Sequence, residues 1–227
     1  MSAGKAREAR DRKQIDIRRA AIEEFARHGY RGASTQAIAA RAGLSKPQLH
    51  YYIDSKEDLY REVLLETMHA WGDLFAVDDA GLSPAQVLSD YIRRKLEFSF
   101  DHPLMSRIFT AEMLAGAPVF KPYMAVYRRR TAAAATMIRR WIDRGLMRPV
   151  DPLQLLMNIW AVTQSYADHR DQVLFYMRKP ALGIADRERI IAHVTSLILT
   201  GCGLGAAPVA AAARRRPARR PAKSASP

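Results

Sequence analysis

The chain is poor in the residues on which several classes of protein depend. It has a single cysteine, Cys202, among 227 residues, so an intrachain disulfide and a paired Cys-x-x-Cys zinc site are both excluded. No apolar run approaches the ~18 residues of a membrane helix, and no apolar core follows the charged N-terminus as in a signal peptide. We therefore expect a cytoplasmic protein that is neither exported nor embedded in a membrane.

The residue patterns of common catalytic sites are missing as well. The six histidines include no i, i+4 pair that could hold a metal, and the chain has no glycine-rich phosphate loop. Cys202 has no local partner that would activate it as a nucleophile. We therefore predict that the protein is not an enzyme, and we expect no catalytic residue, no metal site and no cofactor.

Strand alternation bounded by hairpin signals is also absent, and the apolar periodicity is helical throughout. Several helical segments begin with a capping residue followed by proline, as at Ser83-Pro84 and Asp151-Pro152. The sequence predicts an all-α fold of about nine helices. Residues 14–60 form the first unit of this fold and residues 61–205 the second.

Positive charge is the feature that the chain has in excess. The formal net charge is +13 and the sequence pI is about 10.2, which favours a polyanionic partner such as nucleic acid. This charge gathers at both ends of the chain. We expect residues 1–13 to form a flexible basic arm, and residues 206–227, rich in Ala, Pro and Arg, to form a disordered basic tail.

Residues 14–60 have the pattern of a helix-turn-helix unit. Gly43 permits the positive φ of a tight turn, and Ser45 can cap the helix that follows it. The third helix of such a unit can enter the ~12 Å major groove of DNA. Leu49 and Tyr52 are expected to face the small core, and the polar positions left to read DNA are Lys46, Gln48, His50 and Tyr51.

The same region resembles the signature of the TetR family in order and spacing. The matching residues are Gly29-Tyr30-Arg31-Gly32, Ser34-Thr35, Ile38-Ala39, Ala42-Gly43-Leu44-Ser45-Lys46, Leu49, Tyr52 and Ser55-Lys56-Glu57-Asp58-Leu59. The resemblance implies that Thr35 and Lys56 contact phosphates and that residues 46–51, Pro47 included, face the groove. His50 stands where many members have a phosphate-contacting tyrosine, so the contact at this position stays open.

Two later segments are similar to the pyrimidine-utilisation regulators of this family, which bind uracil. One runs from Tyr91 to Pro118 and the other from Ile159 to Asp168. The resemblance implies a small planar heterocycle as effector, since a carboxamide can match its alternating donors and acceptors and an aromatic ring can stack on it. The candidate ligand residues are Lys95, Glu112, Trp160, Gln164 and Tyr166.

Each of these candidates also has a structural alternative. Trp160 can be plain core or dimer interface, and Glu112 can serve as a cap or pair with Arg107. The apolar faces of residues 152–167 and 186–200 are expected to form a four-helix bundle with their two-fold mates. A homodimer of this kind would read a palindromic operator.

The most direct functional interpretation is a ligand-responsive regulator, in the simplest case a repressor, that a pyrimidine-like molecule releases from double-stranded DNA. Two alternatives remain open. One is the same fold sensing a larger lipophilic compound, such as a drug or an acyl thioester. The other is an architectural protein that coats DNA without a ligand, which would show a steep salt dependence and little sequence preference.

Overall fold

The chain begins with a long helix where the sequence predicted an irregular arm. The computed structural model describes residues 2–72 and 81–205. In it α1 spans Ser2–Gly32, with a kink at Gly29, where φ is 65°. Residues 2–13, called the N-terminal extension below, are therefore helical and not a flexible arm. They are rich in good helix formers, and Glu8 and Arg12 form an i, i+4 ion pair at 3.8 Å.

Three helices pack into the small head of the molecule. After α1 come α2 (Thr35–Arg41), which Ser34 caps, and α3 (Lys46–His50), which Ser45 caps. Gly43 has a φ of 66° and supplies the turn between them. Ile17, Phe25, Ile38 and Leu49 are almost completely buried and fill the centre of the head. The predicted helix-turn-helix is confirmed.

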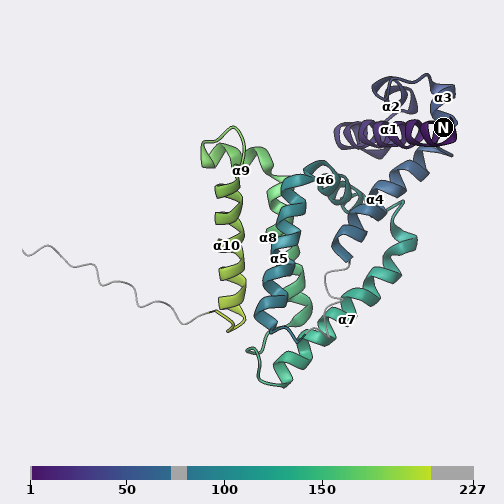
Figure 1. Ribbon diagram of the computed structural model, residues 1–227. Coiled ribbons are helices and arrows are strands. Elements are labelled where there is room, and N and C mark those ends of the chain that lie inside the picture. The colour runs from purple at the N-terminus through teal and green to yellow at the C-terminus, as the bar shows by residue number, and fades with distance from the viewer. Residues whose placement is uncertain (1, 73–80, 206–227) are drawn as a thin grey trace, which may run out of the picture.

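The remaining helices build the body, into which α4 descends from the head (Figure 1). They are α4 (Lys56–Gly72), α5 (Pro84–Asp101), α6 (Pro103–Leu114), the short 3-10 helix η2 (Lys121–Tyr123), α7 (Met124–Asp143), α8 (Pro152–Asp168), α9 (Arg170–Met177) and α10 (Ile184–Gly201). The all-α prediction is confirmed. The described residues contain ten α-helices instead of about nine. The additional one is the short α9, which begins after helix α8 ends at Asp168.

The head and the body share one of the two apolar cores. Met105 and Ile108 of α6 join the core of the head together with Phe120 of the loop that follows α6, and α6 packs on both α1 and α4. The second core lies between α5, α7, α8 and α10. Helix α6 therefore contacts both the head and the body. Because α6 packs directly on α1, a displacement of α6 changes its contacts with α1.

Some expectations fall on parts of the chain that the structure does not describe. The predicted tail at 206–227 lies outside the described residues. In the described residues, no helix is both long and apolar enough to cross a membrane.

Candidate nucleic-acid interface and effector site

Helix α3 presents the residues that the sequence assigned to DNA reading. Lys46, Pro47, Gln48 and His50 are exposed, and Tyr51, which caps the end of the helix, is 73% exposed. Leu49 lies on the opposite side with no exposed surface. The predicted division of this helix into an outer face and a core face is therefore present in the structure.

The side chain of Gln48 has a local role that the sequence analysis did not identify. Its Oε1 accepts a hydrogen bond from the Ser45 backbone N–H at 2.8 Å, while Ser45 Oγ accepts one from the Gln48 N–H at 3.4 Å. This reciprocal pair is a capping box, which fixes the start of α3. The Ser-x-x-Gln spacing was the signal that could have revealed it.

Lys56 also has protein partners in addition to its predicted phosphate. Its Nζ donates to the carbonyl oxygens of Tyr30 at 2.9 Å and Ala33 at 3.0 Å. The ammonium group also lies 4.7 Å from the centre of the Tyr30 ring. Lys56 therefore ties the start of α4 to the end of α1. Thr35, the other predicted phosphate contact, is half-buried at the first position of α2.

Lys95 is the most unusual of the predicted effector residues. It is only 3% exposed, and its Nζ lies 3.5 Å from the centre of the Trp71 ring. Burial lowers the pKa of Lys95 to about 7, although the nearby Asp168 carboxylate acts in the opposite direction. The indole Nε1 of Trp71 is buried without a hydrogen-bond partner in the described structure. Trp71 was not among the predicted effector residues, because only the packing of α4 and α5 brings it to Lys95.

Gln164 belongs to a polar cluster between α6 and α8. Its Nε2 donates to Thr110 Oγ1 and to Asp168 Oδ1, both at 3.1 Å. Thr110 Oγ1 in turn donates to Asp168 Oδ2 at 3.0 Å. Ser106 lies one turn before Thr110 on α6, and its buried hydroxyl has no partner in the described structure. Thr110 and Asp168 were not predicted, because only the packing of the two helices brings them to Gln164.

The other predicted effector residues have structural partners. The indole N–H of Trp160 donates to the Tyr91 hydroxyl on α5. Tyr166 packs edge-on against Phe100 with ring centres 6.0 Å apart, and burial raises its pKa. For Trp160 the geometry supports the core alternative rather than an open stacking platform.

Glu112 holds a loop instead of pointing toward Gln164. Its Oε1 accepts hydrogen bonds from the backbone N–H groups of Val119 at 2.7 Å and Phe120 at 2.8 Å. Burial and the adjacent Glu112 carboxylate together raise the pKa of Tyr60. The geometry supports the capping alternative for Glu112, because this carboxylate already accepts two backbone hydrogen bonds. Its pairing with Arg107 is not what the structure shows.

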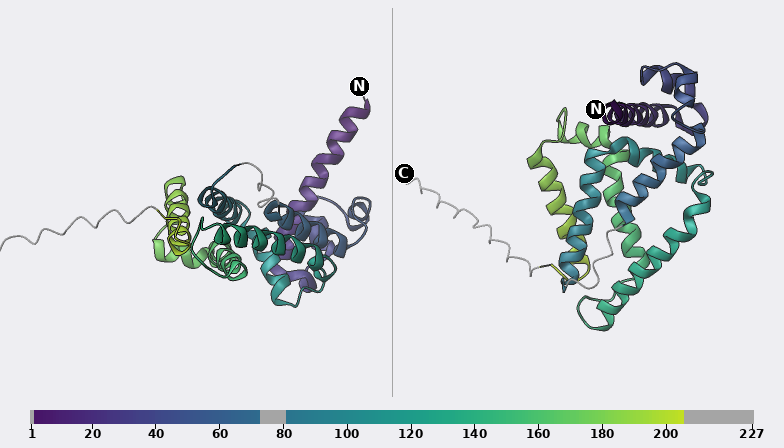
Figure 2. Two further views of the ribbon diagram at one scale, coloured as in Figure 1. Left: turned by 90° about the horizontal axis from the view of Figure 1, so that it is seen from below. Right: turned by 45° about the vertical axis from the view of Figure 1, so that its right-hand side comes forward.

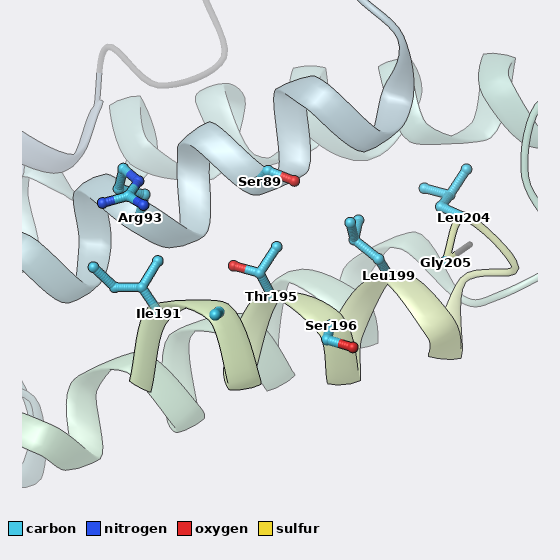
Figure 3. A pocket seen from close by; sticks show the side chains of 9 residues that line it. Ser89, Arg93, Ile191, Thr195, Ser196, Leu199, Leu204 and Gly205 are labelled. Atoms are coloured by element: carbon cyan, nitrogen blue, oxygen red, sulfur yellow. The ribbon is translucent and has the colours of Figure 1, made fainter. Parts of the chain in front are cut away.

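A surface groove of about 360 Å³ lies elsewhere, between α5 and α10. Figure 3 shows Ser89 and Arg93 on α5 facing Ile191, Thr195 and Leu199 on α10. None of the predicted effector residues lines this groove. No group of three or more possible metal ligands was found among the described residues.

Comparison with known proteins decides the family. The model for bacterial regulatory proteins of the tetR family matches residues 17–63, and that for the C-terminal region of YcdC-like proteins matches residues 62–205. The chain belongs to the TetR family. As a member of this family, it is a ligand-responsive transcriptional regulator that binds DNA, and it is not an enzyme.

Individual relatives agree with this assignment. The chain is 37% identical to the transcriptional regulator RutR of Escherichia coli K12 over 173 residues, which are 76% of this chain and 82% of RutR. It is 28% identical to the repressor SCO4008 of Streptomyces coelicolor over 63% of this chain and 74% of that protein. The crystal structure of the regulator SCO4942 from S. coelicolor superposes with a TM-score of 0.62 at 25% identity, over 84% of this chain and 98% of that one.

Proposed function

We propose that this TetR regulator binds a palindromic operator as a homodimer and is released by a small planar heterocycle of the pyrimidinedione type. The observation that carries the effector assignment is the buried ammonium group of Lys95 over the Trp71 ring, next to the Thr110–Gln164–Asp168 cluster. Burying a charged group is costly because it loses its hydration, so buried charged groups are found mainly at functional sites or in ion pairs.

The chemistry of this region suits a flat ring with alternating N–H and C=O groups. The Gln164 amide offers both a donor and an acceptor, and Trp71 Nε1 and the Ser106 hydroxyl are buried polar atoms without partners in the described structure. The ring of a pyrimidinedione can take the place of the Lys95 ammonium group on the indole face. The similarity to uracil-binding regulators points to the same class of ligand.

Helix α6 is the element through which an effector can act on the head. It carries Thr110 at the polar cluster and Met105 and Ile108 in the core shared with α1. A ligand that redistributes the hydrogen bonds of Thr110 therefore shifts α6 against α1. A change in the separation of the two heads needs to be worth only ~1–3 kcal/mol to release DNA.

Exposed apolar side chains on α8 and α10 support the dimer. Leu153 and Met157 lie on α8, and Ile184 and Leu197 on α10, all exposed in the single chain. Covering such side chains against a second copy is favourable, and a two-fold dimer matches the symmetry of a palindrome.

The effector assignment is tested with Gln164→Leu. We expect isothermal titration to detect uracil or thymine binding by the wild-type protein and at least about 30-fold weaker binding by the variant, because the donor and the acceptor of the ligand left unpaired cost roughly 1–3 kcal/mol each. Gln172→Leu, at an exposed position on α9, is the matched control and should bind like wild type. Unchanged affinity in Gln164→Leu would place the effector elsewhere; a response to an acyl thioester alone would favour the lipophilic alternative.

The DNA-reading assignment is tested with Gln48→Ala and Lys56→Ala. Loss of the Gln48 amide removes a possible bidentate pair with adenine, worth about 1–3 kcal/mol of base discrimination, so sequence preference should relax. Lys56→Ala removes a cation and releases the end of α1, so it should weaken binding to every duplex. Gel shifts on selected and scrambled DNA measure both. Equal losses on the two duplexes for Gln48→Ala would show that it only caps α3.

A further inference from the structure

The N-terminal extension of α1 is a charged part of the described chain that the proposed function does not use. Figure 2 shows it projecting from the head as a free helical end. It contains five basic residues and two acidic ones, Lys5, Arg7, Arg10, Arg12 and Lys13 against Glu8 and Asp11. All of these charged side chains are exposed except Lys13, which is half-buried.

Two contacts fix this extension next to the DNA-reading helix. The Arg10 guanidinium lies 5.8 Å from the centre of the Tyr51 ring, at the end of α3. Lys13 Nζ donates to the Ala42 carbonyl oxygen at 3.3 Å, in the turn between α2 and α3. Arg7, Arg10 and Lys13 follow one another at three-residue intervals and share one side of the helix. The basic side of the extension is therefore the side that meets α3.

Most of the charge on this side is available to a partner. Among the described residues, neither Arg7 nor Arg10 has a carboxylate within ion-pair distance, whereas Arg12 is paired with Glu8. An arginine that stacks on an aromatic ring keeps its N–H groups free for a phosphate. Arg10 is thus held by Tyr51 in a position from which it can still bind an anion.

We propose that the N-terminal extension is a second DNA-contacting element, which binds backbone phosphates flanking the half-site that α3 reads. At 1.5 Å per residue, residues 2–13 form a helix about 18 Å long, more than the ~12 Å width of the major groove. Duplex DNA presents a phosphate charge about every 1.7 Å along its axis, so Arg7 and Arg10 have phosphates within this reach. The extension adds affinity and lengthens the protected segment without reading sequence.

This inference rests on the proposed function, and its test starts from a duplex that the full-length wild-type protein selects from a randomised pool. Binding is measured as a function of salt on that duplex with ten base pairs on each side of the palindrome, and on the same duplex trimmed to the palindrome. The variant is Arg7→Gln with Arg10→Gln. The control is Arg139→Gln with Arg144→Gln, two exposed arginines at the end of α7 that lies away from the head (Figure 1).

We expect wild type and control to lose affinity on trimming and the Arg7/Arg10 variant to bind both duplexes alike. Four lost phosphate contacts per dimer reduce the slope of log K against log salt by about 3.6. Between 50 and 200 mM salt, the factor by which affinity falls should therefore be about 150 times smaller for the variant than for wild type. Circular dichroism should show unchanged helix content, since glutamine is a good helix former.

The outcomes separate the two proposals. A variant that keeps the wild-type salt slope and the wild-type loss on trimming overturns the role of the extension and leaves the proposed function intact. A slope that falls equally in variant and control also overturns it, because net charge alone then explains the effect. A wild-type protein that selects no duplex overturns the proposed function, and this inference with it.

Discussion

Replacing Lys95 with methionine should stabilise the protein at pH 6.5 and leave its stability nearly unchanged near pH 10.5. In the folded chain burial lowers the pKa of Lys95 from 10.5 to about 7, so the folded state binds fewer protons than the unfolded state between these values. The stability of the wild-type protein therefore rises with pH across this window, by up to about 1.4 kcal/mol per pH unit from this group.

Denaturant unfolding of both proteins at fixed protomer concentration, from pH 6 to 10.5, measures this effect. The stability difference between variant and wild type should be largest below pH 7 and shrink toward pH 10.5, while the contributions of other groups cancel. Lys121→Met, at an exposed position, should show no such trend. A difference for Lys95→Met that does not change with pH would mean that the ammonium group is well solvated in the folded protein.

Replacing Glu112 with alanine should lower the free energy of unfolding by about 2–4 kcal/mol. The change leaves the buried N–H groups of Val119 and Phe120 without an acceptor, and each unsatisfied group costs roughly 1–3 kcal/mol. Denaturant midpoints measure the loss. Glu112→Gln, which keeps an amide oxygen in place, should lose less.

The matched control for this prediction is Glu97→Ala. Glu97 is a glutamate of α5 whose side chain is 47% exposed and ion-paired to Arg93 at 3.3 Å, so its replacement should change stability by no more than about 0.5–1 kcal/mol. Similar losses for Glu112→Ala and Glu97→Ala would contradict the assignment of Glu112 as the anchor of the loop after α6.

The parts of the fold that sequence reasoning predicts well are those set by short-range chemistry. The cap at Ser45 and the positive φ at Gly43 both depend on neighbours within a few residues. The helices of the body were predicted from the spacing of apolar residues, which is also a short-range pattern. The helical structure of the N-terminal extension was not predicted, because its composition fits a solvated arm as well as a helix. Its contact from Arg10 to Tyr51 joins residues that are far apart in the sequence.

The candidate effector site could be predicted only in part. The sequence named Lys95 and Gln164 as candidates, but it did not indicate their partners, which come from other helices: Trp71 from α4, and Thr110 from α6. No local pattern encodes such pairings, because they depend on how the helices cross. For Glu112 the sequence left a ligand role and a structural role open, and the hydrogen bonds to the loop after α6, which favour the structural role, depend on tertiary packing.

The central claim is that a pyrimidine-type effector releases a dimer of this chain from a palindromic duplex. Fluorescence anisotropy of a labelled, wild-type-selected duplex, titrated with protein in the absence and presence of saturating uracil, tests it most directly. The account predicts two protomers per palindrome and at least 10-fold weaker DNA binding with uracil, the effect of about 1.4 kcal/mol of coupling. One protomer per duplex, or an isotherm that neither uracil nor thymine changes, would contradict it.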